Sequence, residues 1–202
     1  MTTALFGVAG YFAGSMPFGY WLVRVLKGVD IRTIGSGNIG ASNVWRTFGR
    51  RYGLAAALLD IAKAFVPTLL ATIVAGDLAG AITGAAAMLG HWRPVFLRFQ
   101  RGGKMVATCG GAFLGLAPVV GGIGAGVWIL CFLLFRYASV ASIVAALSLP
   151  VVAAALDESW PVIGFAIGAA LGVAVLHRGN IARLRAGTEN KFTLRRRRTA
   201  AA

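Results

Sequence analysis

Acidic residues are scarce in this chain. Only 6 of its 202 residues are Asp or Glu, against 20 Lys and Arg, which gives a formal net charge of +14. The carboxylates are also scattered, which excludes a two-magnesium phosphoryl-transfer site, because such a site needs carboxylate ligands close together. No set of His, Cys, Asp and Glu has zinc spacing, and no G-x-S-x-G nucleophile elbow occurs. We therefore expect a function that needs neither a metal nor another cofactor.

Cysteine and histidine are rare as well, with two of each. Cys109 and Cys131 lie far apart in apolar stretches without a C-x-x-C pattern, so they are predicted to be small core residues rather than a disulfide or metal ligands. Neither His91 nor His177 has an Asp five residues later. The chain therefore lacks the H-x-x-x-x-D signature of the acyl-CoA-dependent glycerolipid acyltransferases.

Charged residues of either sign make up only 13% of the chain, whereas soluble proteins average about 25%. Hydrophobic residues reach 58% and the mean hydropathy is +0.77. Because a transmembrane helix needs about 20 mainly apolar residues, we predict an all-α, polytopic integral membrane protein. It would form one domain over residues 1–202, with a basic cytoplasmic tail at 193–202. The seven predicted transmembrane helices are Thr3–Leu26, Gly53–Ala75, Leu78–Leu97, Val106–Val120, Gly122–Phe135, Ser139–Leu156 and Trp160–Leu176.

The basic residues separate by side of the membrane. With seven spans and the N-terminus outside, nineteen of the twenty Lys and Arg fall in or beside cytoplasmic loops, and the other, Lys63, lies inside the second span. The opposite loops contain Asp77, Asp157 and Glu158 but no basic residue. By the positive-inside rule we predict an outside N-terminus and a cytoplasmic C-terminus. The positive charge is then expected to meet anionic membrane lipids rather than nucleic acid.

The stretch IGSGNIGASNVWR, from Ile34 to Arg46, lies between the first two apolar segments. Its glycines allow backbone N–H groups to approach a ligand, and consecutive exposed N–H groups form an anion-binding concavity. Serine and asparagine side chains add polar groups, and Arg46 adds a planar cation. The stretch therefore predicts a phosphate site. The alternative is a flexible linker, because short glycine-rich patterns also arise by chance.

Three further polar clusters fall on the same side, at Gly90–Thr108, Arg136–Ser142 and His177–Phe192. The first contains a short glycine loop followed by Lys104, although it is not a Walker A motif. In the last, His177 and Asn180 are three residues apart and would share a helix face, with His177 either transferring a proton or capping the helix. A transporter would place its polar groups near the bilayer midplane. Crowding at one interface instead favours an enzyme that joins a lipid to a soluble molecule.

Asp60 and Lys63 lie three residues apart within the second predicted span, so they share a helix face. Ionisable residues inside a span are paired or functional. We interpret these two as an ion pair that docks the helix on its neighbours, with a functional role as the alternative. His91 precedes Trp92 and Pro94, and we interpret it as an anchor at the membrane interface.

The motifs together resemble those of the bacterial acyl-phosphate:glycerol-3-phosphate acyltransferase family, and the resemblance covers nearly the whole chain. It is carried by the segments GSMPFGYWL, GSGNIGASNVWRTFG, LLDIAKAF, GHWRPVF, GGKMVAT, RYASVAS and HRGNIARLRAGTENK. The second glycine motif departs from the family pattern. Arg101 looks like an additional residue before the glycines, Met105 stands where a third glycine is usual, and Arg93 replaces a common aromatic.

The resemblance implies seven spans and an active site at the cytoplasmic face of a bacterial inner membrane. It also implies roles for individual residues. The residues implied to be catalytic are Ser36, Arg46, His177 and Asn180. The residues implied to bind substrate are Gly37, Asn38, Gly40, Ser42, Asn43, Gly102, Gly103, Lys104, Ser142 and Glu189.

The implied reaction moves a fatty acyl group from acyl phosphate to the 1-hydroxyl of glycerol 3-phosphate, giving 1-acyl-glycerol-3-phosphate for phospholipid synthesis. An acyl phosphate is a mixed anhydride and needs no covalent enzyme intermediate, so orientation and charge neutralisation supply most of the barrier lowering. The hydroxyl proton goes either to His177 or to a substrate phosphate oxygen. We expect a monomer. The alternatives are a carrier for a phosphorylated solute, which would predict inverted repeats that the two halves do not display, and a structural membrane subunit.

Overall fold

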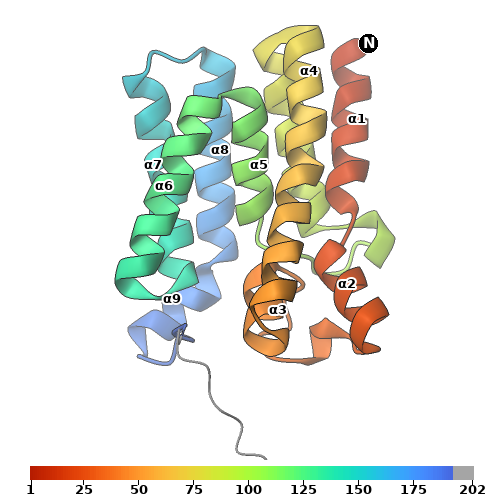
Figure 1. The fold of residues 1–202 in the computed structure, drawn as a ribbon. Helices are drawn as coiled ribbons and strands as arrows, with labels where there is room; N and C mark the ends of the chain where they lie inside the picture. Colours follow the sequence, from red (N-terminus) through yellow and green to blue (C-terminus); the bar gives the residue numbers. More distant parts are fainter. Residues whose placement is uncertain (193–202) are drawn as a thin grey trace, which may run out of the picture.

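The computed structural model describes residues 1–192, and the tail predicted at 193–202 lies outside the described residues. The described part is built from helices and loops without a β-strand, so the predicted all-α class is confirmed (Figure 1). The helices are α1 (Thr2–Ser15), α2 (Phe18–Lys27), α3 (Ala41–Phe48), α4 (Arg50–Trp92), α5 (Val106–Leu116), α6 (Pro118–Phe135), α7 (Ala138–Ala155), α8 (Trp160–Leu176) and α9 (Arg178–Arg185), with short 3-10 helices at Ile31–Thr33 and Val95–Leu97.

Helix α4 is a hairpin of two limbs. Its backbone leaves the helical conformation at Gly76, where φ is 78° and ψ is −179°, a region that favours glycine. A Cβ on Gly80 would lie 2.1 Å from Thr72 Oγ1, and one on Gly84 would lie 3.4 Å from Thr68 Oγ1. Residues at equal distances from Gly76 therefore face each other, which places the two limbs side by side. The limbs correspond to the second and third predicted spans.

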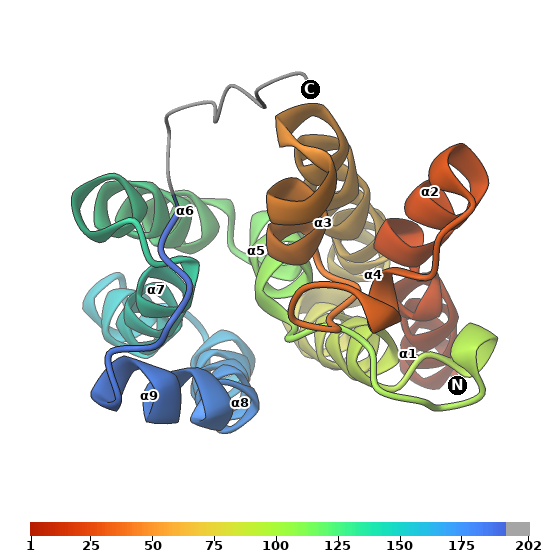
Figure 2. The same cartoon turned by 90° about the horizontal axis from the view of Figure 1, so that it is seen from below.

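The first predicted span, Thr3–Leu26, is wrong as a continuous helix. Helix α1 ends at Ser15, and Met16 has an extended conformation before Pro17. Proline lacks a backbone N–H and disfavours helical backbone at the residue before it, which explains the break. Helix α2 lies displaced sideways from α1 (Figure 2) and ends at Gly28 in the left-handed region, with φ at 69°.

The break between the fourth and fifth predicted spans falls inside the stretch APVVGGIGAG, where Pro118 and four glycines predict it. It lies at the start of that stretch, at Ala117, rather than near residue 121, and Pro118 starts α6. Proline suits the first turn of a helix, where its missing N–H has no partner to lose. Gly121 lies inside α6, where a Cβ would come within 2.8 Å of the backbone nitrogen of Leu114. This glycine therefore permits close helix packing rather than ending a helix.

Within residues 1–192, three helices are long and apolar enough to cross a membrane, at Arg50–Leu97, Pro118–Phe135 and Ala138–Ala155. A fourth candidate is α8 together with α9, which are bent by 54°. The first of these contains both limbs of α4. Helix α1, with 14 residues, and α5, with 11, are shorter. Counting the limbs of α4 separately, α1 and α4–α8 provide seven helical segments within residues 1–192.

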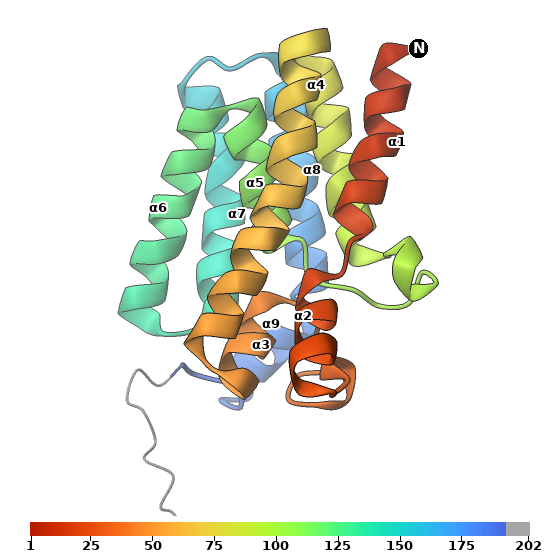
Figure 3. The same cartoon turned by 45° about the vertical axis from the view of Figure 1, so that its right-hand side comes forward.

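The two ends of the bundle differ. Helices α2, α3 and α9 gather at one end, here called the polar end, while Met1, the α4 turn and the α7–α8 loop lie at the other (Figures 1 and 3). At that opposite end Ser159 Oγ donates a hydrogen bond to Asp77 Oδ2 over 2.6 Å, so the α4 turn and the α7–α8 loop touch. In the view along the bundle, α5 lies between α1–α4 and α6–α9 (Figure 2). Segments from the whole chain therefore converge at the polar end.

Candidate active site

The glycine-rich stretch forms a compact loop between α2 and α3, and Asn43, which is 2% exposed, lies at its centre. Its Nδ2 donates to the carbonyls of Ile34 (3.0 Å) and Asn38 (2.9 Å), and its Oδ1 accepts from the backbone N–H of Ser36 (3.0 Å). Gly35 has a φ of 62°, and a Cβ there would lie 2.4 Å from Asn43 Oδ1. Only glycine fits this position, so the loop is a built structure and the linker alternative is wrong.

Several backbone N–H groups of this loop donate hydrogen bonds to acceptors in the loop itself. The N–H of Gly37 donates to Ile34 O over 3.1 Å, and that of Gly40 donates to Asn38 Oδ1 over 2.8 Å. The backbone N–H groups of Ser36, Gly37 and Gly40 therefore already have acceptors, and they cannot form the open anion site that the glycines suggested. The sequence pattern identified the loop, but the direction of its N–H groups depends on the buried Asn43 side chain.

The backbone N–H groups that remain without an acceptor follow directly after Gly40 in the chain. Those of Ala41 and Ser42, in the first turn of α3, have no acceptor among the residues that the structure describes. The first N–H groups of a helix have no intrahelical partner, and their combined dipole attracts anions. Ala41 and Ser42 both line the cavity described below, so this helix start faces it.

The second glycine motif is held between two segments. The N–H groups of Gly102 and Gly103 donate to the carbonyls of Trp92 and His91, both over 2.9 Å. The Nδ2 of Asn38 donates to Gly102 O over 3.2 Å, which joins this loop to the first one. A Cβ on Gly103 would fall 1.9 Å from Nε2 of His91. These glycines therefore allow close packing and present Lys104, the next residue, to the cavity.

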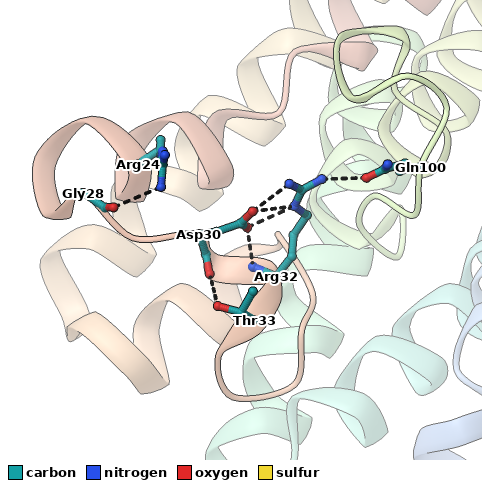
Figure 4. A network of polar contacts seen from close by, with 6 residues as sticks. All are labelled: Arg24, Gly28, Asp30, Arg32, Thr33 and Gln100. Carbon is teal, nitrogen blue, oxygen red and sulfur yellow. Dashed lines mark hydrogen bonds and ion pairs between the residues drawn. The ribbon is translucent and has the colours of Figure 1, made fainter.

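A surface network adds a further link between these two loops (Figure 4). Arg32 binds Asp30 through an ion pair of 2.6 Å and donates to Gln100 Oε1 over 2.7 Å. Nearby, Arg24 Nη1 donates to Gly28 O over 3.0 Å. Hydrogen bonding from Arg32 holds the pKa of Asp30 below its usual value. The Arg32–Gln100 bond thus ties the segment before α3 to the loop that carries Lys104.

The departure at Met105 has a physical explanation. Met105 caps α5 with φ at 68° and ψ at −3°, in the left-handed region where glycine is favoured. This residue therefore occupies a conformation for which the usual glycine is well suited. Its side chain is only 5% exposed and its sulfur lies near Gly172 on α8, so burial of the side chain offsets the backbone strain.

Glu189 connects the third polar cluster. Its Oε1 accepts from Asn180 Nδ2 (2.6 Å) and Ser139 Oγ (2.8 Å), and its Oε2 accepts from Arg183 Nε (2.7 Å). Burial alone would raise the pKa of Glu189, but the three hydrogen bonds outweigh it and hold that pKa below its usual value. The charged carboxylate orients Asn180, whose Oδ1 in turn accepts from Lys104 Nζ.

Burial changes the titration of the two other key groups. It lowers the pKa of Lys104 to about 8, with nearby Arg183 adding to the effect and Glu189 opposing it. It also lowers the pKa of His177 to about 4, so this imidazole is neutral at pH 7. Nδ1 of His177 lies 2.8 Å from Val173 O and must carry the hydrogen, because a carbonyl only accepts. Nε2 is therefore left with a lone pair.

Arg46 and Ser142 complete the site from α3 and α7. The Arg46 guanidinium lies over the ring of Phe192 at 5.2 Å from its centroid, with Nη1 3.5 Å from Asn190 O. The Ser142 hydroxyl donates to Ala138 O over 2.6 Å and accepts from Trp128 Nε1 over 3.1 Å. Among residues 1–192, the only hydrogen bond of the Arg46 guanidinium is the one to Asn190 O.

These groups meet at one end of a cavity of about 400 Å³. Away from the polar end it is lined by apolar residues of α4–α8, including Leu54, Phe113, Trp128, Ile129 and Leu149. Gly37, Gly102 and Gly103 do not line it. Within residues 1–192, no three His, Cys, Asp or Glu lie close enough to hold a metal ion. The predicted site residues that line it are Ser36, Asn38, Gly40, Ser42, Asn43, Arg46, Lys104, Ser142, His177, Asn180 and Glu189.

A buried polar cluster adjoins the site and contributes Asp60 and His91 to the cavity wall, and sequence reasoning found only part of it. Asp60 Oδ1 lies 2.7 Å from Lys63 Nζ, which confirms the predicted ion pair. Lys63 Nζ also lies 2.9 Å from His91 Nδ1 and donates to Met16 O over 2.7 Å. His91 is 3% exposed, so its interpretation as an interface anchor is wrong. The sequence did offer one signal: a buried lysine needs three hydrogen-bond acceptors, so Lys63 had to have partners besides Asp60.

Comparison with known proteins bears on this arrangement. The model of the glycerol-3-phosphate acyltransferase family matches residues 4–187. The chain is 47% identical over 186 residues to a glycerol-3-phosphate acyltransferase of Desulforudis audaxviator, a match that covers 92% of this chain and 93% of that protein. It is 49% identical over 183 residues to one of Geobacter metallireducens, covering 90% and 93%.

A solved structure is similar over nearly the full length. The crystal structure of PlsY, an integral membrane glycerol 3-phosphate acyltransferase, matches in its glycerol 3-phosphate form with a TM-score of 0.91 and 38% identity over 96% of both chains. Its lysophosphatidic acid form matches with a TM-score of 0.89 and 37% identity. The chain therefore belongs to the glycerol-3-phosphate acyltransferase family.

Proposed function

We propose that this protein is an enzyme that transfers a fatty acyl group from acyl phosphate to the 1-hydroxyl of glycerol 3-phosphate, giving 1-acyl-glycerol-3-phosphate and phosphate. The observation that carries the proposal is the two-part cavity. One end presents Lys104, Asn180 and the free Nε2 of His177, Asp60 and His91 also belong to the wall, and most of the remainder is apolar. A lysophospholipid has the same division into a charged head and an apolar chain, and the family membership agrees with this assignment.

Two groups of residues would hold the two phosphates. Lys104, Asn180, Arg46 and His177 would bind glycerol 3-phosphate, because they combine cations with hydrogen-bonding groups at one place. The N–H groups at the start of α3, with the hydroxyls of Ser36 and Ser42, would bind the phosphate of the donor. Ser142 would contact the glycerol, and Glu189 would hold Asn180 in place. The remaining predicted residues, Gly37, Asn38, Gly40, Asn43, Gly102 and Gly103, would shape the two loops.

The chemistry requires orientation more than activation. The 1-hydroxyl oxygen attacks the acyl carbonyl carbon, the bond from that carbon to the phosphate oxygen breaks, and phosphate leaves with the bonding electrons. The hydroxyl proton passes either to His177 Nε2 or to a phosphate oxygen. Fixed donors around the developing charges lower the barrier without a covalent intermediate or a metal. A neutral His177 at pH 7 can accept a hydrogen bond from the hydroxyl.

We also propose that the bundle spans a bacterial inner membrane seven times, with the polar end in the cytoplasm. The seven segments are α1, the two limbs of α4, and α5–α8. The placement of Lys and Arg supports this orientation. Leu54 and Ile129 line the cavity and yet are 41% and 54% exposed, so the acyl chain can enter from the side, between α4 and α6. One chain supplies the whole cavity wall, which supports a monomer.

The orientation can be tested by cysteine labelling in intact cells. Single cysteines at Thr2 and Glu158 should react with a membrane-impermeant maleimide from outside, whereas cysteines at Arg50 and Thr188 should react only after permeabilisation. The reason is that the start of α1 and the α7–α8 loop lie at one end of the bundle, whereas α9 and the start of α4, next to α3, lie at the other (Figure 3). The background should carry Cys109→Ala and Cys131→Ala, because both native thiols are free. Labelling of Arg50→Cys from outside would refute the cytoplasmic site.

The donor can be tested with purified protein, glycerol 3-phosphate, and either palmitoyl phosphate or palmitoyl-CoA. We expect turnover with palmitoyl phosphate that persists in EDTA, and little with palmitoyl-CoA. The chain lacks the H-x-x-x-x-D pair, and the α3 start offers two free N–H groups, which suit a single phosphate. Lys104→Ala provides the inactive control. Equal or faster turnover with palmitoyl-CoA would contradict the donor assignment.

A further inference from the structure

The apolar part of the cavity has a measurable depth. On α6 it is lined from Phe132 to Gly121, and on α7 from Ala138 to Leu149. At 1.5 Å per residue, each of these stretches extends about 16 Å along the bundle, away from the polar end. The wall on α5 ends at Phe113. The three helices therefore stop lining the cavity near a common level, which marks its inner end.

That inner end is closed by packed side chains. Phe113 is fully buried, and the centroid of its ring lies 4.7 Å from that of Phe165. Leu149 is 5% exposed. Behind them, the same core contains Val120 and Ala153, both with no exposed surface, and neither lines the cavity. Native cores hold few voids, so a chain that reached Phe113 and Leu149 would find no further space.

Two glycines keep the space below this end free. A Cβ on Gly110 of α5 would meet no atom within 4 Å, although Gly110 lines the cavity. A Cβ on Gly124 of α6 would lie 2.7 Å from Leu149 Cδ2, so glycine lets Leu149 occupy its place at the end. Larger side chains at either position would shorten the cavity. Gly122, also on α6, meets no atom within 4 Å but faces away from the cavity.

We propose that Gly110, Gly124 and the Phe113–Leu149 end wall set the acyl-chain length that the enzyme prefers. This inference rests on the proposed function, because it requires the acyl chain to lie in the cavity during transfer. A hydrophobic pocket discriminates by about 10-fold to 200-fold per methylene gained or lost. A wall placed at a fixed depth therefore acts as a length limit on the donor.

The test is a competition between decanoyl phosphate and palmitoyl phosphate at equal concentration with glycerol 3-phosphate. The ratio of the two products gives the ratio of kcat/KM values whatever the fraction of active protein. Gly110→Leu should lower the palmitoyl-to-decanoyl ratio about tenfold or more. Gly122→Leu, the same change on an outward-facing position, should leave it unchanged. In a second competition, between stearoyl phosphate and palmitoyl phosphate, Leu149→Ala should raise the stearoyl-to-palmitoyl product ratio, because the smaller side chain deepens the cavity.

The outcomes separate the two proposals. Turnover with an unchanged ratio in Gly110→Leu would overturn the length limit and would mean that the acyl tail leaves through the opening between Leu54 and Ile129. If Gly110→Leu is inactive with both donors, Gly110→Ala should still lower the ratio, and an unchanged ratio there would overturn the inference as well. If the unaltered chain forms neither product, the proposed function itself is refuted.

Discussion

Replacing Lys104 by alanine should lower kcat/KM for glycerol 3-phosphate by about 10²-fold to 10³-fold at pH 7, because removing one partner of a buried, hydrogen-bonded charge pair typically costs about 2–5 kcal/mol. Lys104 is the cation that contacts Asn180, and it reaches the cavity from a loop fixed by Gly102 and Gly103. The change should leave the folded protein extractable, because the loop is held by backbone hydrogen bonds. Lys27→Ala, at an exposed lysine of α2, is the matched control and should retain normal turnover.

The pH dependence gives a second measure of the same residue. Because the pKa of Lys104 is lowered to about 8, the empty site loses this charge as the pH rises above 8. The KM for glycerol 3-phosphate should therefore increase above pH 8 in the unaltered protein. In Lys104→Arg this increase should disappear, because arginine stays charged, while kcat should fall because the guanidinium has a different shape. Unchanged KM values in Lys104→Ala would remove this residue from the phosphate site.

Replacing His177 by alanine should lower kcat by about 10²-fold or more, the usual contribution of a positioned proton acceptor. The hydrogen bond from Nδ1 to Val173 O fixes the ring and leaves Nε2 as the acceptor. Since the pKa of His177 is about 4, protonation of this residue should lower the activity of the unaltered protein only below about pH 4 to 5. We expect no such decline in the residual activity of the variants.

The glutamine variant distinguishes two roles for His177. If Nε2 takes the hydroxyl proton, His177→Gln should be as inactive as His177→Ala, because an amide cannot accept a proton at this pH. If the proton goes to a phosphate oxygen of the substrate, glutamine should retain part of the rate by holding the hydroxyl. Melting temperatures of all three proteins control for folding. Full activity in both variants would exclude His177 from the site.

Eleven of the fourteen site residues that the motifs and the family resemblance implied line the cavity, although most of its other lining residues were not predicted. The sequence did not predict toward which acceptors the backbone N–H groups of the glycine loops point. Gly102 and Gly103 read as donors to a phosphate, yet their N–H groups donate to α4 carbonyls. That outcome depends on how α4 ends near the second loop. The same limit applies to His91, whose partner Lys63 is 28 residues away on the other limb of α4.

Breaks in the helices were predictable only where the local chemistry is strong. Pro17 and Pro118 both lie next to the breaks, and the rules for proline account for them. The prediction of the second break used Pro118 together with four glycines, and the boundary was placed among the glycines, whose effect depends on neighbours. Gly76, by contrast, falls where the two spans were expected to turn. The glycine of the family pattern indicates the left-handed conformation of Met105, whereas the burial of its side chain near α8 depends on tertiary packing that the sequence does not reveal.

The cluster around Lys63 has a consequence for how the chain is made. Its ammonium has three hydrogens, and its three acceptors come from Met16, Asp60 and His91, which leave the ribosome at widely separated times. An ammonium short of partners is costly in lipid. The first limb of α4 can enter the bilayer with Asp60 alone, but its charge is fully satisfied only when the second limb folds back against it. We therefore expect the segment up to His91 to insert cooperatively, and truncation of the nascent chain before His91 should leave an insertion intermediate exposed to membrane proteases.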